Sequence, residues 1–150
     1  MDSVKFRFFK QSDYSEFKKM CRALYREDPV DETITDRKIS KTVRELQKNP
    51  IRDRIIIFEE GDVIVGYSIL IFYWSNEFGG NVLHIDELYV KPGYRRRGVA
   101  TKFLQYVSQE FKDEIVGLQL EVTPSNTKAM AYYRKLGFVR TRNVHLRRKK

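Results

Sequence analysis

A turn of glycines and arginines, reading GYRRRG over residues 93–98, is the part of the sequence best suited to hold an anion. It leads into a stretch, 97–111, whose apolar residues recur at helical spacing. The first N–H groups of a helix have no partner within the helix, and the helix dipole places partial positive charge there. Because Gly98 removes the side-chain obstacle and arginines surround it, we expect this turn to bind a diphosphate.

The residue pattern of this turn differs from the two common nucleotide-binding fingerprints. It reads Val90-x-Pro92-x-x-Arg95-x-x-Gly98-x-Ala100, which matches neither the Walker P-loop nor the GxGxxG dinucleotide turn. Taken alone, the pattern would favour an ordinary basic turn at the start of a surface helix. A second pattern further along the chain decides between the two interpretations.

That second pattern spans the last predicted helix. It reads Asn126-x-x-Ala129-x-x-x-Tyr133-x-x-x-Gly137-Phe138. Asparagine is a favoured N-cap and glycine suits the position just after a helix, so the pattern predicts a helix from about 127 to 136. In this order and context, the two patterns resemble the hallmark motifs of the GNAT N-acetyltransferases. Within that family the chain is most similar in character to the small-molecule amine and diamine acetyltransferases.

The resemblance implies that acetyl-CoA is the cosubstrate and that no metal takes part. In the family a β-bulge separates the fourth strand from the fifth, the pantetheine arm pairs with the fourth strand, and the turn amides hold the pyrophosphate. The cofactor-binding residues implied here are Leu88, Tyr89, Val90, Arg95, Arg96, Arg97, Gly98, Val99, Ala100, Asn126 and Tyr133. The sequence also lacks a group of Cys and His residues at metal-ligand spacing.

The resemblance also implies catalytic roles. Tyr133 matches the tyrosine that many members use as general acid toward the departing CoA thiolate, and the pKa values of a phenol and a thiol are similar. His84, Asp86 and Glu87 are candidates for the base, because an amine must lose a proton before it attacks the thioester. We favour Glu87 or Asp86 acting through water, with His84 next. Strict alternation of side chains along a strand puts His84 and Asp86 on one face of the sheet and Glu87 on the other. A bulge in the strand can change this arrangement.

The acceptor amine is not named by the resemblance, but charge gives one clue. Segment 28–36 holds Asp28, Asp31, Glu32 and Asp36 and no lysine or arginine. In the family the loop between the first two helices borders the acceptor site, where an acidic rim would attract a cationic amine. Acids in loops also serve as turn and cap residues, and that interpretation stays open. Two alternatives remain for the function: a protein or peptide N-acetyltransferase, and a non-catalytic CoA-binding regulatory module.

The elements that must position these residues follow a definite order. Runs rich in β-branched and aromatic residues predict strands, and apolar residues at helical spacing between capping signals predict helices. The order is β-α-α-β-β-β-α-β-α-β-β, which predicts one α/β domain, 1–150, with a mixed sheet and helices on its faces, as in the GNAT fold. The expected strands are 4–9, 54–58, 63–73, 82–90, 115–122, 138–142 and 144–147, and the expected helices are 13–26, 36–48, 97–111 and 127–136.

The composition of the chain limits the kinds of partner and location that we expect. A net charge of +9 suggests an anionic partner, and the cofactor, nucleic acid and acidic lipid would all fit. Because part of the excess lies in the turn and in the terminal run RRKK, the charge does not require nucleic-acid binding. The sequence shows no apolar run of membrane-spanning length and no secretory leader, which predicts a cytoplasmic protein. We expect the single cysteine, Cys21, in the core, and a homodimer would be in keeping with the family.

Overall fold

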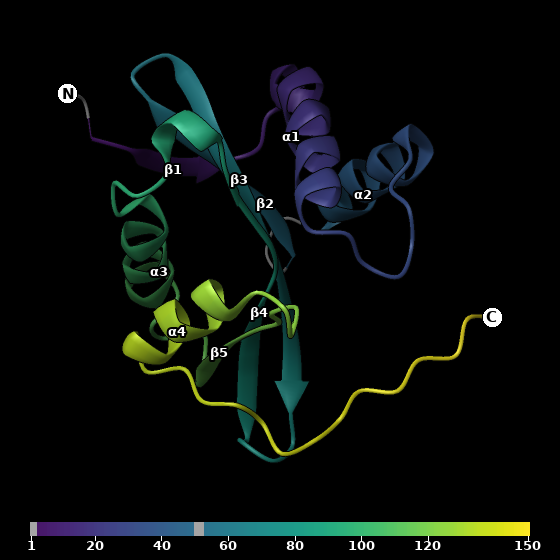
Figure 1. Cartoon of the computed structure of the whole chain (residues 1–150), viewed down its shortest axis with the longest axis vertical. Helices are drawn as coiled ribbons and strands as arrows, with labels where there is room; N and C mark the ends of the chain where they lie inside the picture. Colours follow the sequence, from purple (N-terminus) through teal and green to yellow (C-terminus); the bar gives the residue numbers. More distant parts are fainter. Residues whose placement is uncertain (1–2, 50–52) are drawn as a thin grey trace.

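The centre of the protein is a five-stranded mixed sheet whose strands lie in sequential order (Figure 1). The computed structural model describes residues 3–49 and 53–150. The strands are β1 (Lys5–Phe8), β2 (Arg54–Glu60), β3 (Val63–Ser75), β4 (Gly80–Val90) and β5 (Gly117–Leu120). Strands β1 to β4 pair antiparallel, whereas β5 joins β4 in parallel. The predicted mixed sheet is therefore confirmed.

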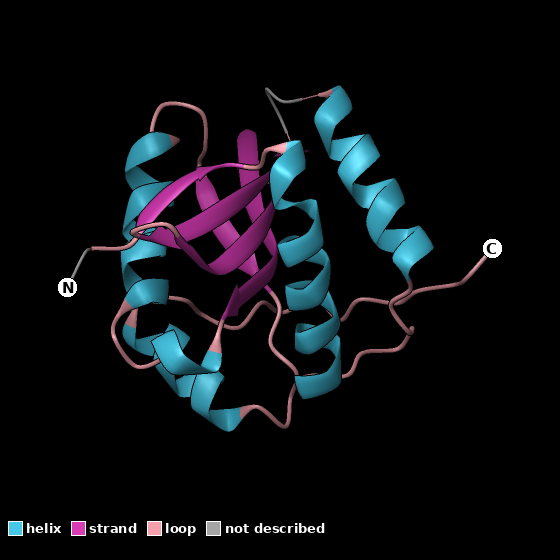
Figure 2. Ribbon diagram, turned by 90° about the horizontal axis from the view of Figure 1, so that it is seen from above, coloured by secondary structure: helices cyan, strands magenta, loops and turns pink. Residues whose placement is uncertain are grey.

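Helices cover both faces of this sheet (Figure 2). The helices are α1 (Tyr14–Glu27) and α2 (Asp36–Lys48) on one face, and α3 (Val99–Glu110) and α4 (Thr127–Lys135) on the other. Each predicted helix is confirmed to within about two residues of its bounds. In the two described stretches, no helix combines the length and the apolar character needed to cross a membrane.

The central strands are apolar on both sides because both sides are covered. In β2, Ile55 and Ile57 belong to the core beneath α1 and α2, while Ile56 and Phe58 belong to the core beneath α3. Burial on two faces explains why this strand reads as a continuous apolar run and not as an alternation.

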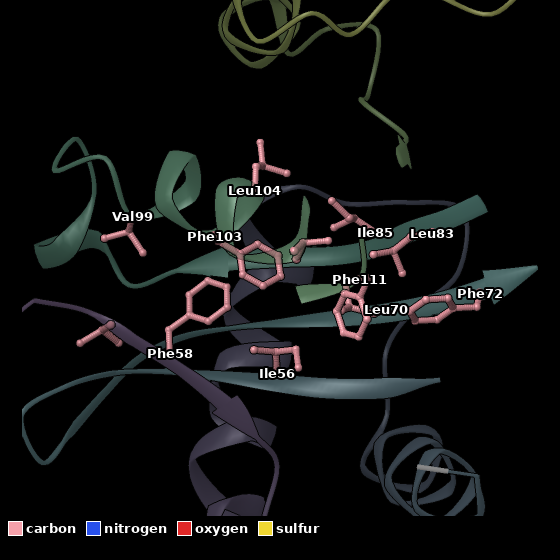
Figure 3. Close-up of a cluster of buried hydrophobic side chains, with 12 residues drawn as sticks. Ile56, Phe58, Leu70, Phe72, Leu83, Ile85, Val99, Phe103, Leu104 and Phe111 are labelled. Atoms are coloured by element: carbon pink, nitrogen blue, oxygen red, sulfur yellow. The ribbon is translucent and has the colours of Figure 1, made fainter. Parts of the chain in front are cut away.

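The core on the α3 side anchors the helix that follows the glycine-rich turn (Figure 3). Phe103 of α3 packs on Phe58 of β2 with ring centroids 4.7 Å apart, and Phe111 meets Phe72 of β3 edge to face at 5.3 Å. Full burial of one such side chain contributes about 1.5–3 kcal/mol relative to exposure. These contacts hold the middle and end of α3 against the sheet, and Val99 places its first turn in the same core.

A β-bulge interrupts β4 at Asp86. Ile69 of β3 pairs with Glu87 and its neighbour Leu70 pairs with Ile85, so Asp86 is the extra residue. The pairing of β4 with β5 runs only from Val82 to Ile85, so it ends immediately before the bulge. The predicted bulge and the separation of the fourth and fifth strands are both confirmed.

The two strands predicted after α4, 138–142 and 144–147, are wrong. Residues 138–150 run as a loop past the ends of β4 and β5 toward the side of α2 (Figure 1). Val139, Val144 and Leu146 are 86%, 81% and 93% exposed. Their alternation with charged residues therefore has no sheet face to cover, and a β-pattern stabilises a strand only through such packing and pairing.

Candidate functional site

The turn between β4 and α3 has the backbone shape of an anion-binding site. Arg96 and Gly98 both adopt left-handed conformations, with φ of 63° and 77°. Gly98 is the N-cap of α3 without a side-chain cap, and Lys102 N–H donates to its carbonyl at 3.0 Å. The N–H groups of the first helical turn therefore have no partner within the helix. A left-handed residue beside a helix start turns such amides toward one point, where an anion can accept from them.

The three arginines of the turn have different roles. Arg95 donates to the Val90 carbonyl and to Glu27, each at 2.6 Å, so it braces the turn against β4 and α1. Arg97 lies 3.6 Å from Glu60 and stacks over the Tyr94 ring. Arg96 is exposed and, among the described residues, has no carboxylate within ion-pair distance. Arg96 is therefore the arginine of the cluster best placed to meet a ligand.

The gap between β4 and β5 lies on the approach to this turn. Leu88 packs against the core on the α3 side, and Tyr89 is buried in the core on the α1 side. Beyond Ile85, β4 has no β5 partner among the described residues. Backbone groups left unpaired along such a gap can be satisfied by an extended ligand that carries amides of its own. The structure thus places Leu88, Tyr89 and Val90 along the gap and just before the turn.

Glu87 is a buried carboxylate with two phenol donors. Tyr25 of α1 donates to one carboxylate oxygen and Tyr67 of β3 to the other, both at 2.7 Å. Burial raises the pKa of Glu87 above its ordinary value, against the opposing effect of the two hydrogen bonds. Both oxygens are occupied by protein donors, so this side chain ties α1 to the strand beside the bulge.

His84 and Asp86 lie on the same side of the sheet as Glu87, because the bulge shifts the alternation after Ile85. His84 Nε2 lies 3.6 Å from Asp86 Oδ1, and its Nδ1 lies 3.3 Å from the Gln119 amide nitrogen. The Asp86 side chain is 51% exposed, whereas that of His84 is 16% exposed. Of the three base candidates, Asp86 is the one most open to water and to an incoming amine.

Tyr133 reaches the sheet from the opposite side. It packs with the α3-side core and meets the Phe138 ring at 5.6 Å. Burial raises the pKa of Tyr133 to about 12, so its phenol is protonated at neutral pH. The neighbouring Tyr132 shares a hydrogen bond of 2.5 Å with Thr101 of α3. Tyr133 therefore lies on the α3 side of the sheet, whereas the base candidates lie on the α1 side.

The predicted cap of α4 is present. Asn126 Oδ1 accepts from the Ala129 N–H at 3.2 Å, and Gly137 follows the helix with a left-handed φ of 93°. Capping uses the carbonyl oxygen of the Asn126 amide and leaves its NH₂ group for another acceptor. In the loop before it, Thr123 donates to Asp28 at 2.8 Å and so links the end of β5 to the α1–α2 loop.

The acidic segment between α1 and α2 already pairs with cations of the chain. Arg147 lies 3.9 Å from Asp31, and Lys149 lies 3.1 Å from Glu32. Asp36 pairs with Arg22. The hydrogen bond from Lys149 is the main reason why the pKa of Glu32 lies below its ordinary value. A rim of acidic residues is therefore present, and the basic C-terminal segment lies against part of it.

Cys21 is buried in the core beneath α1, as predicted, and burial raises the pKa of its thiol to about 12. A thiol with this pKa is a poor nucleophile at neutral pH. Within 3–49 and 53–150 there is no group of three or more His, Cys, Asp or Glu side chains that could hold a metal ion.

Sequence reasoning located the turn, the strand and the tyrosine but missed the side chains that contact the base candidates. Tyr25, Tyr67 and Gln119 come from three different elements, and their contacts depend on strand register. One signal was visible, since Gln119 is a polar residue inside the apolar run Val116–Leu120. A half-buried amide in a strand needs hydrogen-bond partners, so a glutamine in such a run indicates polar side chains beside it.

Comparisons with known proteins agree with this geometry. The model of the acetyltransferase (GNAT) family matches residues 16–138. Thialysine N-epsilon-acetyltransferase of Bos taurus is 34% identical over 79 residues, which make up 52% of this chain and 46% of the bovine protein. The matched segment thus spans less than half of that relative's length.

Solved structures share the fold. A possible acetyltransferase from Clostridium difficile 630 has a TM-score of 0.85 at 22% identity, with 98% and 97% of the two chains covered. Aminoglycoside N-acetyltransferase AAC(6')-Iy, solved in complex with CoA, has a TM-score of 0.80 at 18% identity, with 100% and 97% covered. At these identities the likeness establishes the shared architecture.

Proposed function

The chain belongs to the acetyltransferase (GNAT) family, and from that premise we propose that it transfers the acetyl group of acetyl-CoA to a primary amine. The amine attacks the thioester directly while both substrates are bound. The observation that supports this best is the gap beyond Ile85, which leads straight into the uncapped start of α3. An extended arm and a diphosphate require these two features, in this order, along one strand and one turn.

Cofactor binding divides between backbone and side chains. The backbones of Leu88, Tyr89 and Val90 pair with the pantetheine arm, and the amides of residues 96–100 hold the pyrophosphate. Arg96 adds a charge-assisted contact because it is exposed and has no carboxylate partner among the described residues. Asn126 contacts the cofactor arm through its amide NH₂, the group that capping leaves available.

The chemical step needs one base and one acid. The amine nitrogen loses a proton through water to Asp86 and bonds to the carbonyl carbon of the thioester. The C–S bond then breaks, Tyr133 gives its phenolic proton to the sulfur that leaves, and the second proton lost by the nitrogen as the amide forms returns to the Tyr133 oxygen through water. Asp86 suits the first role because its side chain is half-exposed. Tyr133 suits the second because its phenol is protonated at neutral pH.

The acceptor is a cationic amine drawn by the acidic α1–α2 loop. Thialysine, the substrate in the name of the bovine relative, carries a side-chain amine, and aminoglycosides are polycationic. A lysine side chain of a peptide or protein is the second candidate, because it presents the same amine. A cytoplasmic location and a homodimer remain predictions, and sedimentation of the pure protein tests the second.

Calorimetric titration with acetyl-CoA, followed by a thiol-release assay, tests the proposal. The amine panel contains thialysine, polyamines, aminoglycosides and a lysine peptide. We expect saturable binding, and CoA release with at least one amine. Failure of the wild-type chain to bind acetyl-CoA would contradict the proposal, and binding with no turnover on any amine would favour a regulatory CoA-binding module.

Two glycine variants locate the binding site in the turn. Gly98→Ala places a side chain at a left-handed φ of 77°, which costs about 1–2 kcal/mol and disturbs the amides of α3. We expect acetyl-CoA affinity to fall about tenfold or more. Gly93→Ala is the matched control, because a Cβ there meets nothing within 4 Å and its φ is not left-handed. Equal affinities in both variants would remove the turn from the binding site.

A further inference from the structure

A chain of polar contacts crosses three strands on the α1 side of the sheet. Tyr73 of β3 donates its hydroxyl proton to Gln119 Oε1 at 2.7 Å. Gln119 and His84 are direct register partners on β5 and β4, and the amide nitrogen of Gln119 faces His84 Nδ1. His84 Nε2 in turn faces Asp86 Oδ1. The contacts therefore run in the order Tyr73, Gln119, His84, Asp86, and these four side chains form a polar chain.

The donor and acceptor types of these groups fix where the His84 proton lies. Because the Gln119 carbonyl oxygen accepts from Tyr73, the amide NH₂ is the group that faces the imidazole. An amide NH₂ only donates, so Nδ1 must be the ring nitrogen with the free lone pair. A neutral imidazole then carries its single proton on Nε2, which points at the Asp86 carboxylate.

This tautomer determines which group can take a proton. The Nδ1 lone pair of neutral His84 is used by Gln119, and its Nε2 has no lone pair to offer. Asp86 has an oxygen beyond the one facing His84, and about half of its side chain is exposed. The other titratable groups near Asp86 are Glu87 and Tyr25, and these are hydrogen-bonded to each other.

We propose that Tyr73 and Gln119 are positioning residues that hold neutral His84 with its proton on Nε2. In this arrangement His84 orients Asp86, and Asp86 accepts the proton of the acceptor amine. The inference rests on the proposed acetyl transfer for the role of Asp86, but the tautomer of His84 is a property of the free protein. The two parts can therefore fail separately.

Nitrogen-15 NMR of histidine-labelled protein tests the tautomer without any substrate. The chain has two histidines, and His145→Gln removes the second signal set so that His84 is assigned. At about pH 9, where imidazole is neutral, we expect Nε2 to be protonated and Nδ1 to be unprotonated. A proton on Nδ1 in the wild-type protein would overturn the proposal, whether or not the protein proves to be an acetyltransferase.

Variants of Gln119 separate positioning from mere packing. Gln119→Glu replaces the donor toward Nδ1 with an acceptor, so we expect the tautomer to reverse and kcat to fall about tenfold, with the KM for acetyl-CoA unchanged. Gln109→Glu, an exposed position on α3, makes the same charge change away from the polar chain and is expected to alter neither quantity. Tyr73→Phe keeps the ring volume and removes only the orienting hydroxyl, so it tests the same idea if Gln119→Glu does not fold.

The proton acceptor is identified by comparing two further variants. We expect Asp86→Asn to lower kcat by about 100-fold or more, the usual loss when a general base is removed. His84→Gln retains a donor toward Asp86 and is expected to lose only about tenfold. A larger loss in His84→Gln than in Asp86→Asn would make His84 the base and overturn the assignment. An unchanged His84 tautomer in Gln119→Glu would remove Gln119 from the positioning role.

Discussion

Two adjacent carboxylates at the bulge lie in opposite environments. Glu87 is buried and accepts from two phenols, whereas Asp86 is half-exposed and lies 3.6 Å from His84 Nε2. Burial raises the pKa of Glu87 above its ordinary value, whereas the half-exposed Asp86 side chain keeps its access to water. This separation allows one residue to hold the fold while its neighbour exchanges protons with water.

The effect of Glu87 on stability is expected to depend on pH. Its pKa is raised in the folded protein, so the folded state holds this proton more tightly than the unfolded state does. Stability from this group is therefore full below the ordinary carboxyl pKa and declines as pH rises through the folded value. Glu87→Gln has no such titration, so the stability of the variant relative to wild type should improve as pH rises from the ordinary carboxyl pKa through the raised folded value.

Urea unfolding of both proteins at several pH values measures this difference. Glu110→Gln, on the exposed end of α3, is the matched control and should show no such trend. A stability difference that stays constant across this range would mean that Glu87 titrates alike in the folded and unfolded chains.

Tyr133 and Tyr132 offer a paired test of the acid. We expect Tyr133→Phe to lower kcat about 100-fold while acetyl-CoA affinity stays nearly unchanged, because the hydroxyl acts on the leaving thiolate. Tyr132→Phe removes the bond to Thr101 and should cost about 0.5–1.5 kcal/mol of stability with little change in kcat. Steady-state kinetics and thermal unfolding of both variants measure these effects. Full activity in Tyr133→Phe would exclude Tyr133 as the acid.

The residues that sequence reasoning could find are those whose role depends on local spacing. Gly98, Asn126 and Gly137 follow from helix-end chemistry, and their conformations match that expectation. Gln119 and Tyr25 could not be found in this way, because their partners are distant in sequence and depend on register. The side of the sheet that Glu87 faces was also unpredictable, since a bulge of one residue reverses it.

At the scale of elements, the close pairing of β3 and β4 is what holds the last residues of β4, the proposed cofactor strand, in place. Gly66 lies in β3 opposite Val90, where the backbone of Tyr89 and the ring of Phe58 leave no room for a side chain. A Cβ at this position would lie 2.7 Å from Phe58 Cδ2, and it would contact the Tyr89 carbonyl oxygen. Gly66 therefore sets the spacing between β3 and the last residues of β4.

Gly66→Ala is expected to destabilise the protein by about 1–3 kcal/mol, the usual cost of overpacking a tight interior site. It should also weaken acetyl-CoA binding, because Tyr89 and Val90 must shift. Gly117→Ala in β5 is the control, since a Cβ there meets nothing within 4 Å. Urea unfolding and calorimetry measure the two effects, and loss of stability with unchanged affinity would separate this spacing from cofactor binding.

Elements with an apolar face were predictable, and the final strands were not. The helices and β1 to β5 each place apolar residues in or against at least one of the two cores, so their patterns reflect packing. The segment after α4 has the alternation of a strand but exposes Val139, Val144 and Leu146. An alternating pattern gives no information on whether a partner strand lies beside it, and in this chain β5 is the last strand of the described sheet.

At the scale of the whole molecule, charge is distributed so that the basic C-terminal segment lies against acidic residues after β5 and in the α1–α2 loop. His145 lies 3.8 Å from Glu121, just after β5, while Arg147 and Lys149 reach the α1–α2 loop. All of these side chains are exposed, so each pair is weak and is screened by salt. The segment is therefore held weakly against the rim that a cationic acceptor would approach.

Neutralising Arg147 and Lys149, the two residues of the C-terminal segment that contact the acidic loop, should thus help a cationic acceptor to bind. For Arg147→Gln combined with Lys149→Gln, we expect the KM of such an acceptor to fall about two- to fivefold at low salt, and the difference to vanish at about 0.5 M salt. Arg148→Gln with Lys150→Gln changes the net charge equally at positions with no ion pair among the described residues. The acceptor KM is measured for both double variants at both salt concentrations. Equal shifts in the two variants would assign the effect to net charge. A shift in the first variant alone would assign it to competition between the C-terminal segment and the acceptor.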